Sequence, residues 1–489
     1  MIRWAGFAAA GVLFVLLSTA NAGGYRYGVS DQAFYAPAIA IRLDPALFPR
    51  DRPLFAPQLR AWLAGDLFAW LARVTGADLP MLFAATYLVT LVTFFVAASW
   101  FARGLGLSWW GVSACLLLLT LRHQITRTGA NSLEGYMHPR VLAFALGVMA
   151  FGFLVRQRHA AAGLVTVAAL VVHPTTALWC AVVVIVVFLR SRIDRRNAAH
   201  LAAVMPAIAV LASGAPFLDL RRMDPAWLAV LADKTYLFPS SWPPAVWAVN
   251  LAYPIVLLVI HRHRRRLRAS VPGEGRFVQG LIALVVLFLC SVPFSAGRIA
   301  FAVQLQIARV FWLLDFAVTA YVAWWLMSGR LTRTTTSRVI LLLVLGAFSL
   351  GRGMYVLGVE TKRPLAEVAL PATAWTEAMN WLAGQPASVH VLADPGHAWK
   401  YGVGVRVAAR KDTLLESVKD SAMAMYDRDS AMRVAERSAA LAQFDEMTTD
   451  QLRSLQARFG LDVLVVEADR TFAFPVLYRN AQFVIYDLR

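Results

Sequence analysis

The sequence predicts a polytopic α-helical membrane protein with a small C-terminal α/β domain outside the cytoplasm. The 489 residues are 59% hydrophobic and only 16% charged, which is too apolar for a soluble protein. Apolar runs recur along residues 1–358, and arginine clusters separate several of them. From about Glu360, acidic residues return and the periodicity becomes that of short strands and helices. We therefore expect a transmembrane domain at 1–358 and an α/β domain at 359–489.

The formal net charge of +18 comes mostly from arginine. In a membrane protein such residues usually set the topology, so the sequence indicates no nucleic-acid partner. The three cysteines, Cys115, Cys180 and Cys290, lie inside apolar runs and lack metal-ligand spacing. We expect them to be core residues without disulfide bonds.

The apolar runs predict eleven transmembrane helices. Several are shorter than the roughly 20 residues of a simple crossing, which indicates tilt or partial burial. The predicted spans are 4–20, 80–101, 109–121, 139–154, two short spans within 164–189 that meet at an outer turn at 173–176, 200–217, 244–260, 277–293, 299–326 and 339–357.

Four basic clusters set the predicted topology. They lie at 156–159, 190–196, 261–268 and 330–338, and the positive-inside rule places all four in the cytoplasm. The chain between the first two must therefore cross twice, which predicts a break at His173-Pro174.

This topology puts the N-terminus in the cytoplasm and the C-terminal domain outside a bacterial-type inner (plasma) membrane. The first 22 residues imitate a secretory signal with an A-x-A site, and we favour an uncleaved first span. The predicted outer loops are 22–79 and 122–138.

The first outer loop contains a candidate catalytic acid. Ser30 is a suitable N-cap for a helix that runs to about Leu43, and Asp31 then falls in its first turn, where the helix dipole favours a carboxylate. The alternative is that Asp31 only caps a surface helix. Apolar residues between Leu59 and Val74 follow a helical spacing, which predicts an interfacial helix on the outer leaflet.

The second outer loop concentrates polar side chains that could bind a phosphorylated or sugar-bearing ligand. The alternative is a solvated loop whose Pro139 starts the next helix. His173, in the predicted outer turn, is a further candidate ligand-binding residue. The loop candidates are Arg127, Asn131, Glu134, His138 and Arg140.

The span at 299–326 contains Gln304, Gln306, Arg309 and Asp315. A mid-span arginine is unfavourable by roughly 2.5 to 3.5 kcal/mol on insertion scales, so such residues usually face the protein interior. We expect Arg309, with Gln306, to bind a lipid phosphate. The alternative is a structural Arg309 partnered by Asp315 or by the glutamines.

The C-terminal segment predicts alternating helices and strands. Its Asp394-Pro395-Gly396-His397 segment suits a binding loop or a simple turn. Helices are expected at 372–383, 430–444 and 449–459, and strands at 389–393, 403–408, 462–467, 476–478 and 483–487, the last two forming a hairpin turned at Arg479-Asn480.

The segment Asp31-Gln32-Ala33-Phe34-Tyr35, directly after the first span, resembles the D-E-A-x-Y pattern of GT-C superfamily glycosyltransferases. These include protein O-mannosyltransferases and the aminoarabinose transferases of lipid A. The resemblance also covers the span count and the external C-terminal domain. It implies a polyprenyl-phosphate sugar donor, a glycan, lipid or protein acceptor, Asp31 as general base and Tyr35 near the substrate.

The resemblance implies one inverting displacement, in which a base deprotonates the acceptor hydroxyl and cations stabilise the leaving phosphate. Gln32 replaces the second acid of the family pattern, so no cofactor is certain. A divalent cation would need a second acid such as Glu134 or Asp44. Two alternatives stay open: a transporter or flippase of a lipid-linked saccharide, and a non-catalytic GT-C-like membrane protein.

Overall fold

The computed structural model describes residues 2–191, 219–329 and 332–489, so the predicted span at 200–217 lies outside the described residues. The chain divides into two compact units, which we call the helical unit and the mixed unit. The helical unit comprises Met1–Tyr25, Ala84–Ala215 and Thr235–Ala366, and the mixed unit comprises Arg26–Phe83, Pro216–Lys234 and Glu367–Arg489.

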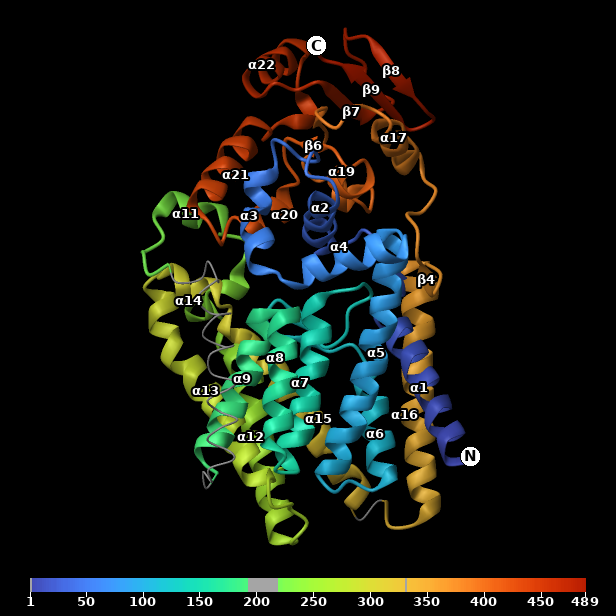
Figure 1. The fold of residues 1–489 in the computed structure, drawn as a ribbon, viewed down its shortest axis with the longest axis vertical. Helices are drawn as coiled ribbons and strands as arrows, with labels where there is room; N and C mark the ends of the chain where they lie inside the picture. Colours follow the sequence, from blue (N-terminus) through green and yellow to red (C-terminus); the bar gives the residue numbers. More distant parts are fainter. Residues whose placement is uncertain (1, 192–218, 330–331) are drawn as a thin grey trace. The chain divides into compact units, whose positions relative to one another are not determined.

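The helical unit is built from apolar helices (Figure 1). Over the described residues, five helices are long and apolar enough to cross a membrane, and shorter apolar helices accompany them. The prediction of a multi-pass helical membrane protein is confirmed, and the count of eleven spans stays a prediction. The helices are α1 (Ile2–Asn21), α5 (Leu79–Gly104), α6 (Trp109–Leu119), α7 (Pro139–Val155), α8 (His159–Val172), α9 (Pro174–Leu189), α12 (Pro244–Arg266), α13 (Glu274–Ala296), α14 (Ala300–Gln304), α15 (Val310–Ser328) and α16 (Thr335–Tyr355).

Polar side chains join several of these helices. Asn21 of α1 donates through Nδ2 to the carbonyl oxygen of Ser349 in α16 at 3.0 Å, and the Ser349 hydroxyl lies 2.7 Å from that of Thr120, which ends α6. Buried hydrogen bonds of this kind stabilise helix pairs where apolar burial gives little preference between partners. Cys115 and Cys180 are buried and free as predicted, whereas the free Cys290 is exposed on α13.

The chain breaks at His173, as predicted. His173 ends α8 and precedes α9, and its Nδ1 accepts a hydrogen bond from the Thr176 amide at 3.3 Å. Pro174 occupies the first position of α9, where its missing N–H is not needed. The two helices pack against each other.

The predicted continuous span at 299–326 is interrupted. Gln306 adopts a left-handed backbone (φ 48°) between α14 and a short 3-10 turn, η3 (Ile307–Arg309), after which α15 begins. The interruption brings Gln306 and Arg309 onto irregular backbone, which membrane proteins tolerate only where it is buried in protein or lines a cavity.

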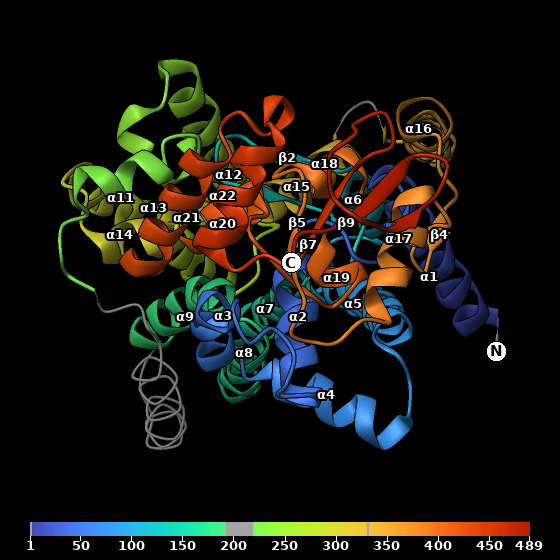
Figure 2. The same cartoon turned by 90° about the horizontal axis from the view of Figure 1, so that it is seen from above.

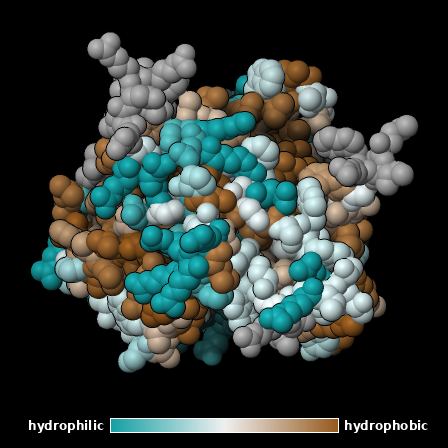
Figure 3. All heavy atoms as spheres, turned by 90° about the horizontal axis from the view of Figure 1, so that it is seen from below, coloured by the Kyte–Doolittle hydropathy of each residue, from teal (hydrophilic) through white to brown (hydrophobic). Residues whose placement is uncertain are grey.

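One end of the helical unit is hydrophilic. The last turn of α12 contains His263, Arg264, Arg265 and Arg266, within the predicted cytoplasmic cluster. Figure 3 views the lower end of the helices of Figure 1, where hydrophilic side chains cross a face that hydrophobic ones border.

The mixed unit contains a five-stranded sheet of order β6-β5-β7-β9-β8. β5 pairs in parallel with β6 and β7, whereas β9 pairs in antiparallel with β7 and β8. The predicted strands near 389–393 and 462–467 and the final hairpin are confirmed. The strands are β5 (His390–Leu392), β6 (Asp412–Thr413), β7 (Val463–Glu467), β8 (Val476–Arg479) and β9 (Phe483–Asp487).

One predicted strand is wrong. Residues 403–408 alternate valine with other residues, yet Val405–Ala408 form the short helix α19. Short apolar runs of this kind do not distinguish helix from strand, and tertiary packing decides. The other helices of this segment are α17 (Ala374–Ala383), α18 (His397–Lys400), α20 (Ser417–Met423), α21 (Arg428–Ala440) and α22 (Thr449–Phe459).

Residues 26–83, which include most of the outer loop predicted at 22–79, pack with the C-terminal segment. They form α2 (Gln32–Leu43), α3 (Arg52–Ala61) and α4 (Ala64–Thr75), and α2 packs against α19 (Figure 2). A buried ionic network fixes this arrangement: Arg406 of α19 donates through Nε to Asp51 at 2.7 Å and also pairs with Asp420.

Burial alone would raise the pKa of Asp51, but the charges of Arg406, Arg433 and Arg437 outweigh it and lower that pKa. The carboxylate therefore stays ionised inside the mixed unit. Removing one partner of such a buried network leaves an uncompensated charge, which is strongly destabilising.

The start of α2 and the interfacial helix differ from prediction. Ser30 is not the N-cap, because it has a left-handed backbone (φ 52°) and α2 begins after Asp31, whose side chain makes no capping bond. The predicted helix at 59–74 is split in two, since α3 ends at Ala61 and α4 begins at Ala64. The predicted apolar stripe lies along α4 and its N-cap residue, where Leu63, Leu67, Trp70 and Val74 are exposed.

Candidate active site

Asp31 lies in the mixed unit, at the start of α2, beside Lys419 of α20. Lys419 Nζ donates to Asp31 Oδ1 at 3.1 Å and lies 5.6 Å from the centre of the Phe34 ring. The Asp31 side chain keeps 28% of its exposure and the Lys419 side chain 12%. The site therefore presents an ion-paired carboxylate that solvent still reaches.

The neighbours of Asp31 in the family-like segment are structural. The Gln32 side chain is fully buried, and its Oε1 accepts a hydrogen bond from the Gly28 amide at 2.6 Å, which closes the turn before α2. Tyr35 is buried as well, with its ring 4.7 Å from that of Trp62. Both side chains fix the backbone that carries Asp31.

In the helical unit, two of the predicted residues, Asn131 and Arg140, contact a third, Glu134. The Glu134 carboxylate is buried and pairs with Nη2 of Arg140, in the first turn of α7. Asn131 Nδ2 donates to both carboxylate oxygens at 3.3 Å, and Arg122 lies 4.0 Å away. Glu134 is therefore neutralised by basic neighbours, and its geometry is that of a loop anchor.

Two predicted histidines cap helices, and their rings lie 6.0 Å apart. His138 Nδ1 accepts from the Arg140 amide at 3.1 Å at the start of α7, while His173 Nδ1 caps α9. Arg127 donates to the Thr235 hydroxyl from a left-handed backbone (φ 54°). His138, His173 and Arg127 therefore hold the loop and the adjoining helix ends in place through hydrogen bonds, and Arg127 also contributes a positive charge.

Arg309 and Gln306 lie together on the interrupted segment between α14 and α15. Gln306 is buried and Arg309 is half-buried. A half-buried guanidinium on irregular backbone has the shape and charge to bind a phosphate through two hydrogen bonds.

The helical unit also contains a histidine–carboxylate pair that the sequence did not predict. His123, in the loop after α6, places Nδ1 3.1 Å from both carboxylate oxygens of Asp315 in α15. Burial opposes a charge on His123, but the hydrogen bond and the charge of Asp315 outweigh it and raise the pKa of His123. Asp315 could be singled out from the sequence because it is a polar residue inside an apolar span. No sequence pattern indicates that His123, 192 positions away, is its partner.

The residues around Asp31 do not fit a divalent cation. Lys419 places a positive charge beside the carboxylate, and the Gln32 carbonyl oxygen is already bonded to Gly28. Throughout the described ranges, no group of three or more His, Cys, Asp or Glu side chains could hold a metal ion. The residues described around Asp31 therefore form no metal site.

No family model and no curated protein sequence matches the chain. Among solved structures, it is similar to the apo oligosaccharyltransferase of Archaeoglobus fulgidus, with TM-score 0.52 and 11% identity over 94% of this chain and 69% of that one. The same enzyme (AglB) in complex with an inhibitory peptide and a dolichol-phosphate has a TM-score of 0.49 and 12% identity, over 96% of this chain and 70% of that one.

The arabinofuranosyltransferase AftD from Mycobacteria has a TM-score of 0.49 and 15% identity, over all of this chain and 42% of that one. The likeness to the apo archaeal enzyme shows the fold alone, and it is a GT-C-like fold. The fold that the resemblance implied is therefore confirmed, and the role of the Asp31 segment stays a prediction.

Proposed function

We propose that this chain is a membrane glycosyltransferase that transfers a sugar from a polyprenyl-phosphate-linked donor to an acceptor on the outer face of the inner membrane. The observation that carries the proposal is the fold likeness to the archaeal oligosaccharyltransferase over 94% of the chain. Asp31, a partly exposed carboxylate at the family-like position, gives the proposal its catalytic residue.

The proposed reaction is a single displacement. Asp31 accepts the proton of the acceptor hydroxyl while its oxygen attacks the anomeric carbon. The bond from that carbon to the lipid-phosphate oxygen breaks with inversion, and the leaving phosphate keeps the electron pair. We assign Arg309 to the leaving phosphate, because a guanidinium can hold two of its oxygens. Lys419 is a positioning residue that orients the Asp31 carboxylate.

The proposal includes the predicted topology, with a cytoplasmic N-terminus and the α/β domain outside. The acceptor class is a glycan, a lipid or a protein. The basic clusters of the sequence and the arginine-rich end of α12 support this orientation.

The test is sugar transfer by the purified protein in liposomes that contain radiolabelled polyprenyl-phosphate monosaccharides, with extracted envelope glycans, lipids and proteins as acceptors. We expect label to move from lipid to acceptor. The variant Asp31→Asn should lose this transfer, and its control is Asp450→Asn, an exposed carboxylate on α22 that has no part in the proposed reaction. No transfer from any donor would refute the proposal.

The second candidate is a transporter or flippase of a lipid-linked saccharide. The interrupted segment around Gln306 favours it, since broken helices with polar side chains often form transport sites. A fluorescent lipid-linked saccharide separates the two functions, because a flippase moves it across the bilayer with the sugar–phosphate bond intact. A non-catalytic GT-C-like protein would do neither.

A further inference from the structure

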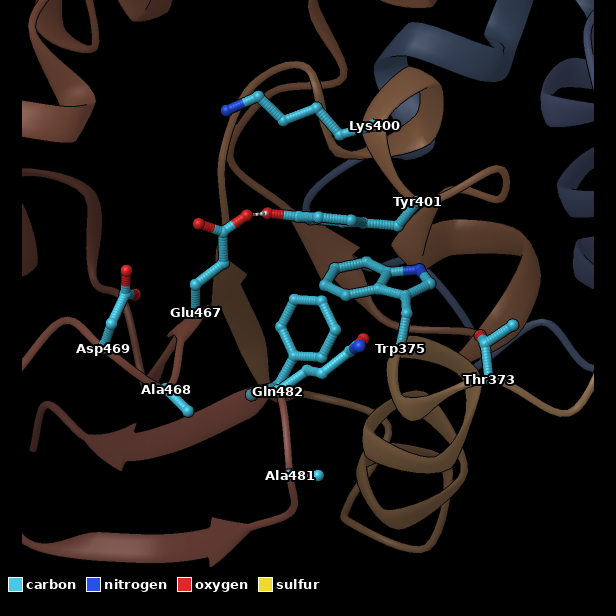
Figure 4. A pocket seen from close by; sticks show the side chains of 10 residues that line it. Thr373, Trp375, Lys400, Tyr401, Glu467, Ala468, Asp469, Ala481 and Gln482 are labelled. Carbon is cyan, nitrogen blue, oxygen red and sulfur yellow. Dashed lines mark hydrogen bonds between the residues drawn. The ribbon is translucent and has the colours of Figure 1, made fainter.

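The mixed unit contains a cavity of about 600 Å³ that the proposed transfer chemistry does not use (Figure 4). It lies where β7 ends, next to the β8–β9 turn and the start of α17. Open α/β sheets usually bind ligands outside the carboxyl ends of their strands. Its lining comprises Thr373, Trp375, Lys400, Tyr401, Glu467, Ala468, Asp469, Ala481, Gln482 and Phe483.

The inner wall of the cavity is a cluster of three aromatic rings. The Tyr401 ring centre lies 4.6 Å from that of Trp375 and 4.8 Å from that of Phe483. Trp375 Nε1 donates to the Val403 carbonyl oxygen at 2.9 Å, and the Tyr401 hydroxyl donates to Glu467 at 2.8 Å. Trp375 and Phe483 are buried, and Tyr401 is the half-buried ring. The wall is therefore rigid before any ligand arrives.

The rim of the cavity is polar and exposed. Glu467 and Asp469 contribute carboxylates and Gln482 contributes an amide, whereas the Lys400 ammonium pairs with Asp394 and the Thr373 hydroxyl caps α17. Figure 4 shows these groups around the aromatic wall. The rim thus combines hydrogen-bond acceptors with donors beside an apolar surface.

We propose that this cavity is a saccharide-binding site. A sugar ring has an apolar C–H face, which packs against an aromatic ring, and hydroxyl groups that donate to carboxylates and accept from amides and ammonium groups. The wall at Tyr401 and the rim at Glu467, Asp469 and Gln482 match these two surfaces. The ligand class is a neutral oligosaccharide, bound without reaction.

Charge argues against the other ligand classes. An anion such as a phosphate would face the carboxylates of Glu467 and Asp469, while Lys400 is already paired with Asp394. A metal ion would need a third ligand beside Glu467 and Asp469. Among the described residues, no three His, Cys, Asp or Glu side chains come together in this way. A neutral ligand that both donates and accepts hydrogen bonds fits the rim best.

This inference goes beyond sugar transfer and does not depend on it, because it concerns binding alone. The experiment uses the full-length protein in lipid nanodiscs on an array of neutral hexose and pentose oligosaccharides. The variants are Asp469→Asn, which removes one acceptor charge, and Ala481→Trp, which fills the cavity. The matched control is Asp450→Asn, an exposed carboxylate on α22 that does not line the cavity.

We expect at least one oligosaccharide to bind, Asp469→Asn to weaken that binding about tenfold, as for a lost hydrogen bond to a charged group, and Ala481→Trp to abolish it. Asp450→Asn should bind as the wild type does. The proposal is overturned if the wild type binds no neutral oligosaccharide or if both cavity variants bind normally.

Discussion

Lys419 donates a hydrogen bond to Asp31 across 3.1 Å, and this pair joins α20 of the C-terminal segment to the start of α2. The carboxylate does not cap its own helix. It is oriented by a cation from 388 positions along the chain, and it remains partly exposed. The ion pair therefore fixes the direction of the Asp31 carboxylate without a capping bond to α2.

Replacing Asp31 should affect turnover far more than folding. Asp31→Asn keeps the size of the side chain but cannot take a proton, so we expect sugar transfer to fall by a factor of roughly 10² to 10⁴. Stability should change by about 1 kcal/mol or less, because the pair is partly exposed. The measurement is transfer per folded molecule, beside a thermal melt. Normal turnover would remove Asp31 from the mechanism.

Replacing Arg309 should weaken donor binding. Arg309→Lys keeps the charge but loses the two-pronged hydrogen bonding to phosphate oxygens, and we expect roughly tenfold weaker binding of a polyprenyl-phosphate sugar. The control is Arg338→Lys, whose guanidinium bonds to the Thr332 carbonyl oxygen at the start of α16. Equal donor affinity in the two variants would refute the assignment.

Chelation should leave transfer unchanged. Lys419 provides the positive charge beside Asp31, and Gln32 holds the Gly28 turn, so no metal is needed at this carboxylate. Transfer rates are to be compared in excess EDTA and with added Mg²⁺ or Mn²⁺. A loss of activity in EDTA that a metal restores would show that a cation takes part in transfer.

The mixed unit should lose stability in mild acid through His390 of β5. Burial lowers the pKa of His390 from 6.5 to about 4, so between these values the unfolded chain binds a proton that the folded chain does not. The contribution of neutral His390 to the free energy of unfolding is fully present above about pH 6.5. It is lost as the pH falls towards 4, and the loss is roughly 3 kcal/mol at most.

The measurement for His390 is a comparison of melting temperatures at about pH 7.5 and about pH 5. The variant His390→Gln should show a smaller drop than the wild type, because glutamine does not titrate. An equal drop in both proteins would assign the acid sensitivity to other groups.

Helix α4 should lie in the membrane interface. Leu67 and Trp70 are 50% and 54% exposed on its outer stripe, and only Gly76–Asp78 separate it from α5, so the two helix ends lie within roughly 14 Å. A spin label at Leu67→Cys should collide with oxygen more than with a water-soluble nickel complex.

The label on α4 requires a Cys290→Ser background, because Cys290 is exposed while Cys115 and Cys180 are buried. A label at Asp450→Cys on α22 provides the aqueous reference. If both labels prefer the nickel complex, α4 faces water and its apolar stripe has another partner.

The sequence alone determined the membrane class, most helix positions and the break at His173. These features depend on local composition, and proline, apolar runs and arginine clusters report them directly. It also determined most of the strands near the C-terminus, where β-branched runs are bounded by turn residues.

Only the tertiary structure decided which residues meet. The partnership of Asp31 with Lys419, the pairing of His123 with Asp315, and the packing of residues 26–83 with the C-terminal sheet all join distant segments. No local pattern specifies such contacts, because a side chain's partner depends on how helices and strands pack. The Val405–Ala408 helix shows the same limit, since a strand-like valine pattern became helical around the buried Arg406.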